Sequence, residues 1–172
     1  MIRSFGQERP EIHPETFIAE GAQVWGRVSL AIGVSIWPGA VLRGDLAPIR
    51  VGAYSNLQEG ALAHVDPDLP LELGQYVTVG HGAIIHSARV GDGTLIGMGA
   101  ILLNGAVVGA GSILGAGSLV GEVKEIPAGV LAFGQPAQVK RDLRPEELAD
   151  LRRWAEEYWR LAMIYRDGSD VD

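Results

Sequence analysis

The sequence contains no cysteine, which excludes disulfides, thiolate metal sites and a thiol nucleophile. Any metal must therefore be bound by nitrogen or oxygen ligands. Basic residues are also scarce, because 14 Lys and Arg stand against 21 Asp and Glu and give a formal net charge of -7. Nucleic acids and anionic membranes both reward clustered positive charge. This balance disfavours both as partners and favours a small or neutral substrate.

Long apolar runs are missing as well. The first ten residues, Met1 to Pro10, include polar and charged residues where a signal peptide needs an apolar run. No later segment approaches the roughly 20 consecutive apolar residues that a membrane-spanning helix needs. We therefore expect a cytoplasmic protein, and its length predicts one domain.

Glycine, in contrast, is abundant, with 24 residues, and apolar residues recur at every sixth position along most of the chain. This period fits neither a helix of 3.6 residues per turn nor the two-residue alternation of an antiparallel strand. It is typical of a solenoid whose coils have three short sides, each with one apolar residue pointing inward. The apolar positions are Ile12, Ile18, Val24, Leu30, Ile36, Leu42, Val51, Leu57, Ala63, Leu73, Val79, Ile85, Val90, Ile96, Leu102, Val108, Leu114, Val120 and Ile126.

We therefore predict an all-β fold, a parallel β-helix whose coils stack at the ordinary strand spacing of about 4.8 Å. The hexapeptide pattern covers roughly residues 12–137 and resembles the left-handed β-helix superfamily. The left hand is taken from this resemblance, because spacing cannot show it and ordinary crossover connections are right-handed.

A helix is predicted beyond the β-helix. Pro145, followed by two glutamates, has the chemistry of a helix start. From Leu148 to Tyr165 apolar residues are spaced three and four apart, which predicts one stripe packed along a side of the β-helix. We assign residues 1–140 to the β-helix and 141–172 to a helix and tail of the same domain. The acidic tail, 169–172, is predicted to be frayed.

Three of the four histidines lie between positions 64 and 86. Excursions after Leu42 and His64 contain the extra residues that interrupt the six-residue period. When these residues are set aside, the third sides of successive coils align. This alignment places Arg43, His64 and His86 in one column. Two imidazoles separated by one strand spacing can converge on one ion at the distance of about 2.0–2.1 Å that zinc–nitrogen bonds need.

His81 lies on the second side of its coil and should face a different wall from His86. It cannot easily join the other two within one chain, whereas a closed three-fold assembly can bring different walls of neighbouring subunits together. We therefore predict a homotrimer with metal sites between subunits. Gln58, one coil before His81 on the second side, faces the same junction. His13 lies far from this group and is predicted to be structural or exposed.

Taken together, Arg43-Gly44-Asp45, Pro48-Ile49, Asn56, Gln58 and the three histidines resemble the γ-class carbonic anhydrase family, and the likeness covers nearly the whole chain. The resemblance implies that His64 and His86 bind the metal from one subunit and that His81 binds it from the neighbour.

The resemblance also assigns roles around the metal. Arg43 and Asp45 would form an ion pair between subunits, and Gln58, oriented by Asn56, would hydrogen-bond the metal-bound solvent. For Asn56 a role in satisfying a turn is an equal alternative. Tyr158 resembles a family tyrosine that approaches the site from the helix, but its place in the apolar stripe equally suggests packing.

The implied cofactor is one divalent metal ion per site, Zn²⁺, with Fe²⁺ or Co²⁺ as alternatives. The implied activity is that of a lyase, the reversible hydration of carbon dioxide to bicarbonate by a metal-bound hydroxide. A metal-dependent acyl-CoA thioesterase is the second hypothesis. An acyltransferase needs one histidine base and no metal, so the histidine trio counts against it. A non-catalytic metal-binding trimer is the last alternative.

Overall fold

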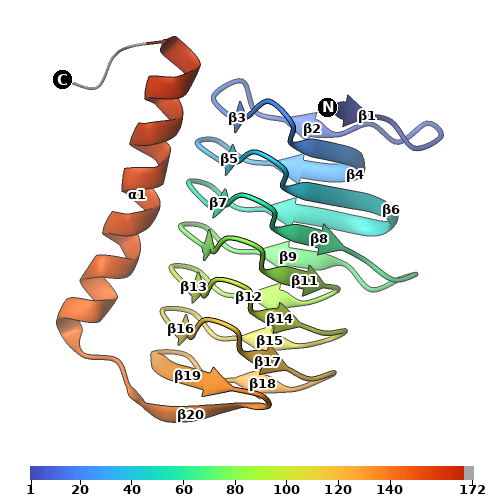
Figure 1. Ribbon diagram of the computed structural model, residues 1–172. Coiled ribbons are helices and arrows are strands. Elements are labelled where there is room, and N and C mark those ends of the chain that lie inside the picture. The colour runs from blue at the N-terminus through green and yellow to red at the C-terminus, as the bar shows by residue number, and fades with distance from the viewer. Residues whose placement is uncertain (169–172) are drawn as a thin grey trace.

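The computed structural model describes residues 1–168, which form a left-handed parallel β-helix of about seven coils with one helix beside it (Figure 1). The predicted fold class is confirmed. The tail, residues 169–172, lies outside the described residues, so its predicted fraying stays a prediction. Among residues 1–168, no helix is long and apolar enough to cross a membrane.

Each coil contributes one strand to each of three walls. The first wall contains, in spatial order, β2 (Glu11–Ile12), the end of β4 (Gln23–Leu30), the end of β6 (Val41–Val51), β9 (Leu71–Leu73), β12 (Arg89–Val90), β15 (Val107–Val108) and β18 (Glu125–Ile126). The strands pair in parallel.

The second wall is a separate sheet. Its parallel strands are β3 (Phe17–Ile18), β5 (Ser35–Ile36), β7 (Asn56–Leu57), β10 (Thr78–Val79), β13 (Leu95–Ile96), β16 (Ile113–Leu114) and β19 (Val130–Gly134). The last strand, β20 (Ala137–Asp142), pairs antiparallel with β19 and closes this end of the solenoid.

The third wall contains the first halves of β4 and β6, followed by β8 (Leu62–His64), β11 (Ile84–His86), β14 (Ile101–Leu102) and β17 (Leu119–Val120). At the other end of the solenoid, β1 (Ile2–Arg3) pairs with β4. The extra residues after Leu42 continue the single long strand β6, so this excursion remains within the sheet. The excursion after His64 is a short turn that contains a bridge between Asp66 and Leu69.

The core is the column of inward apolar residues that the six-residue period predicts. Ile36, Leu57, Ile96, Leu102 and Leu114 have no exposed surface. Burying one such side chain contributes about 1.5–3 kcal/mol to stability, so the repeated positions dominate the packing of the solenoid. Some corner glycines are required by close stacking of the coils: a Cβ at Gly80 would lie 2.7 Å from the backbone nitrogen of Met98.

The helix α1 (Pro145–Asp167) runs along the second wall (Figure 1). Glu147, at its third position, accepts a hydrogen bond from the backbone N–H of Arg144, which closes the first turn. Leu151, Ala155 and Ala162 are buried. The predicted stripe therefore packs through its middle, whereas its last member, Tyr165, is 69% exposed.

Aromatic residues at one corner hold α1 in place. Tyr54 and Tyr76 stack with ring centroids 5.2 Å apart, and Trp159 of α1 meets Tyr54 edge-on at 5.7 Å. Arg152 lies 4.5 Å above the ring of Tyr76. Both tyrosines have positive φ, 58° and 55°, at a corner position where adjacent coils carry glycine, such as Gly93. Contacts with the helix offset this unfavourable backbone conformation.

Candidate metal centre

Two of the predicted ligands meet on the third wall. His64 ends β8 and His86 ends β11, and the two residues are direct partners in the parallel pairing. Nδ1 of His64 lies 2.9 Å from Nε2 of His86. Arg43 is the partner of His64 in the preceding coil, so the column predicted from the spacing is present.

Each of these rings has an oxygen acceptor at its other nitrogen. Asp45 Oδ1 is 3.1 Å from Nε2 of His64, and Asn104 Oδ1 is 2.5 Å from Nδ1 of His86. In the next coil the strand register aligns Leu103 with His86, so Asn104 lies one residue beyond the histidine column and the six-residue period does not single it out.

Asp45 is an ionised neighbour of this pair. Its carboxylate also contacts the guanidinium of Arg43 in the same chain. Burial alone would raise the pKa of Asp45, but hydrogen bonds from Arg43 and His64 outweigh burial, so the pKa lies below its ordinary value. The ion pair forms within one chain here, and a pair between subunits stays a prediction.

The ring nitrogens of His64 and His86 suit a cation. His64 lies between two acceptors, the Asp45 carboxylate and His86 Nε2, and a neutral imidazole can donate from only one of its nitrogens. A positive ion beside the two rings would satisfy the lone pairs that the protein cannot, and neutral imidazole is a common metal ligand. The residues on this wall therefore fit the implied metal.

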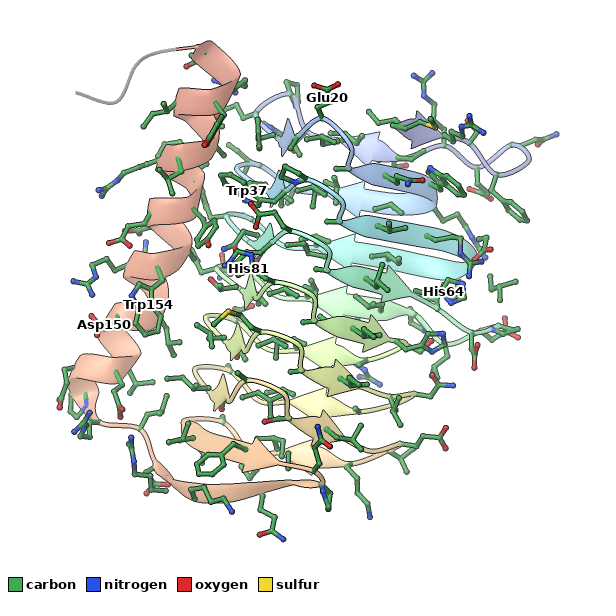
Figure 2. All side chains as sticks on the ribbon, in the orientation of Figure 1. Glu20, Trp37, His64, His81, Asp150 and Trp154 are labelled. Carbon is green, nitrogen blue, oxygen red and sulfur yellow. The ribbon has the colours of Figure 1, made fainter. Side chains whose placement is uncertain are left out.

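His81 lies on another wall, in the turn after β10, close to α1 (Figure 2). Its Nδ1 is 2.7 Å from Glu59 Oε2, and its side chain is 47% exposed. Within residues 1–168 of one chain, no group of three or more His, Asp or Glu residues is arranged to hold a metal ion. Within one chain, His81 therefore does not join His64 and His86.

The amides predicted near the metal form a buried chain on the second wall. Gln58 Nε2 donates to Asn56 Oδ1 at 3.3 Å, and Asn56 Nδ2 donates to Thr78 Oγ1 at 3.0 Å. Asn56 therefore does contact Gln58, as the resemblance implies, and it is also anchored to the next coil.

A cavity of about 450 Å³ adjoins His81 and Gln58, between the second wall and α1. Apolar side chains line most of it, among them Leu95, Met98 and Ile113 from the wall and Trp154 from α1. Figure 2 shows Trp154 on the part of α1 that lies beside this wall. The cavity can hold a small apolar molecule next to polar groups.

Tyr158 also lines this cavity. Its ring meets Trp37 edge-on, with centroids 5.4 Å apart, so it packs as well as facing the cavity. Burial, and secondarily the charge of Glu59, raises the pKa of Tyr158. The hydroxyl therefore stays protonated at neutral pH and can donate a hydrogen bond.

Comparisons with known proteins give the chain relatives over most of its length. The family model "Bacterial transferase hexapeptide (six repeats)" matches residues 87–122. The chain is 46% identical, over 84% of its length and 91% of the relative's, to the "Probable carbonic anhydrase" of Methanocaldococcus jannaschii. It is 40% identical to the "Carbonic anhydrase" of Geobacillus kaustophilus, over 96% of this chain and 91% of that one.

A plant relative and a solved structure extend the comparison. The chain is 41% identical to "Gamma carbonic anhydrase 2, mitochondrial" of Arabidopsis thaliana over 91% of its own length, but it spans only 58% of that protein. A hexapeptide transferase family protein from Anaplasma phagocytophilum superimposes with a TM-score of 0.92 at 35% identity, covering 95% of this chain and 97% of that one. The chain belongs to the γ-class carbonic anhydrase-like family of hexapeptide-repeat proteins.

Proposed function

We propose that three copies of the chain assemble and bind a divalent metal ion at each interface, through His64 and His86 of one subunit and His81 of the next. The observation that carries this proposal is the pairing of His64 and His86 at 2.9 Å, with His81 on a different wall. A closed three-fold assembly is the simplest way to bring two different walls together.

The proposed activity is reversible hydration of carbon dioxide. When bound by three imidazoles, an ion such as Zn²⁺ supplies an activated water by lowering its pKa to about 7. Zn²⁺, Fe²⁺ and Co²⁺ all accept imidazole ligands.

The residues of the chain would bind and orient the reactants. The apolar cavity beside His81 would hold carbon dioxide and exclude bulk water. Gln58, fixed by Asn56, would present a rigid amide to the attacking oxygen. Arg43 and Asp45 would fix the ring of His64. Tyr158 would donate a hydrogen bond from the opposite side of the cavity.

Stopped-flow measurement of carbon dioxide hydration tests the proposal. The protein is loaded separately with Zn²⁺, Fe²⁺ and Co²⁺ and compared with His86→Ala and with His13→Ala, a matched histidine outside the site. We expect hydration by the wild type and by His13→Ala, and its loss with the metal in His86→Ala. A trimer that binds metal but hydrates no carbon dioxide would contradict the proposed activity.

A second candidate function is the hydrolysis of acyl-CoA thioesters with the same metal. The cavity favours it, because about 450 Å³ is the space of roughly fifteen water molecules, far more than carbon dioxide requires. The same preparations should therefore be assayed with an acyl-CoA. Thioester hydrolysis without carbon dioxide hydration would select this candidate.

A further inference from the structure

Asn104 connects a candidate metal ligand to the neighbouring turn. It follows β14, one coil after His86, and its side chain bridges two groups. Oδ1 lies 2.5 Å from Nδ1 of His86, and Nδ2 donates to Asp66 Oδ2 at 2.6 Å. Asp66 belongs to the turn after β8, residues 65–70, which the sequence shows as an interruption of the six-residue period.

The bridge fixes the direction of the Asn104 amide. An ionised carboxylate can only accept hydrogen bonds, so the NH₂ group must face Asp66 and the carbonyl oxygen must face His86. A carbonyl also only accepts, so Nδ1 of His86 must carry the hydrogen. In neutral His86 the lone pair then lies on Nε2, the nitrogen that faces His64.

The backbone that carries the Asp66 side chain is itself held in place. The backbone N–H of Asp66 donates to Ser87 Oγ at 2.7 Å, and Ser87 Oγ donates to the carbonyl of Leu69 at 2.9 Å. Because Ser87 directly follows His86, the turn is fastened to the strand that carries the ligand. The direction of the Asn104 amide is therefore set by a constrained partner.

We propose that Asn104 is a positioning residue that selects the Nδ1–H form of His86 and ties the 65–70 turn to the metal site. The expected effect of Asn104 on metal affinity rests on the proposed function. Equivalent groups serve the other rings: Asp45 contacts His64, and Glu59 contacts His81. Asn104 differs because it also orders a neighbouring turn.

Two variants separate the two bonds of Asn104, and a third variant is the control. Asn104→Leu removes both bonds, whereas Asn104→Asp keeps an acceptor for His86 and loses the donor to Asp66. Glu122→Leu is the matched control, because Glu122 is exposed and lies 18 residues after Asn104, one coil period further on. Circular dichroism and thermal unfolding of the metal-free proteins confirm that each variant folds.

The first measurement is Zn²⁺ affinity by competition with a chelator. Losing a residue that orients a metal ligand costs about 10–100-fold in affinity, so Asn104→Leu should weaken Zn²⁺ binding by that factor. Asn104→Asp, whose carboxylate keeps an acceptor for His86 but is repelled by Asp66, should weaken Zn²⁺ binding less than Asn104→Leu does. Glu122→Leu should bind Zn²⁺ as the wild type does. Limited proteolysis should cut the 65–70 turn faster in both Asn104 variants. Unchanged affinity in Asn104→Leu, or an equal loss in Glu122→Leu, would overturn the inference.

The second measurement does not depend on metal. Nitrogen-15 NMR of the metal-free protein reports which ring nitrogen of His86 carries hydrogen, and we expect Nδ1–H in the wild type and its loss in Asn104→Leu. A wild type that shows this form but binds no Zn²⁺ would contradict the proposed function and leave the positioning role standing. An Nε2–H form in the wild type would overturn the positioning role itself.

Discussion

Nδ1 of His64 and Nε2 of His86 lie 2.9 Å apart on consecutive coils, each ring being held from behind by an oxygen acceptor. The proposed metal site uses both rings. His64→Ala and His86→Ala should each lower Zn²⁺ affinity by more than the roughly 100-fold upper range for a lost orienting residue. If both rings bind the same ion, either single variant should already lose nearly all of the metal that the wild type retains, as the double variant does. Metal content after dialysis measures this, and a single variant that keeps a substantial share of the wild-type metal would contradict a shared site.

The separation of His81 from the other two histidines predicts complementation between subunits. His81→Ala trimers and His64→Ala trimers should each bind little metal. When the two proteins are unfolded and refolded together, mixed trimers should regain some sites, because one junction can combine an intact His81 with an intact pair. Metal analysis of the mixture, compared with each variant refolded alone, tests this. A site formed within one chain would show no recovery.

The fold could be predicted because the six-residue period determines which residues point inward and which stack. The alignment of Arg43, His64 and His86 follows from the same counting, since one coil period separates equivalent positions. The contact between Asn56 and Gln58 also lies along one wall. These features depend on register alone, and register is what a repeat encodes.

Features at the corners could not be predicted in the same way. The bridge from Asn104 to Asp66 depends on the path of an irregular turn, which no period describes. Tyr54 and Tyr76 occupy corner positions with positive φ, where α1 packs against them, and this tertiary contact is absent from local sequence. The cavity beside His81 likewise exists only after the helix has docked.

Val123 has an unfavourable conformation that substitution should relieve. It is 81% exposed with φ of 51°, and one coil earlier the equivalent residue is Gly105. A left-handed conformation costs an L-residue about 1–2 kcal/mol, and Asn tolerates it better than a β-branched residue. Val123→Asn should therefore stabilise the protein by about 1 kcal/mol, or raise Tm by roughly 2–4 °C. Val139→Asn, at an exposed strand position, is the control and should give no gain.

Glu147 should make the attachment of α1 sensitive to acid. Hydrogen bonds from Arg141, and then from the backbone of Arg144, hold its pKa well below the ordinary value of 4.5. A lowered pKa contributes stability above the ordinary value, and this contribution is lost as pH falls below it. Glu147→Gln should therefore lower Tm at pH 7, and the difference from wild type should shrink below pH 4.5. Glu146→Gln is the neighbouring control and should change Tm less.

Tyr158→Phe separates the two roles of this residue. Phe keeps the ring that packs on Trp37 but removes the hydroxyl that lines the cavity. If the hydroxyl donates to the reacting molecule, kcat/KM for carbon dioxide should fall several-fold while Tm near neutral pH stays the same. Unchanged activity would assign Tyr158 to packing alone.

The decline of stability at alkaline pH provides an independent check on the environment of the Tyr158 hydroxyl. Burial raises the pKa of Tyr158, and the charge of Glu59 adds to the effect, so the folded protein retains the proton to higher pH than the unfolded chain does. Stability from this residue is complete below the unfolded value of about 10 and is lost as pH rises through the folded value. Thermal unfolding from pH 9 to 11 should therefore show a shallower decline for Tyr158→Phe than for the wild type. Identical declines would mean that the hydroxyl is solvated like that of an exposed tyrosine, and the cavity would then be too wet to hold an apolar substrate beside it.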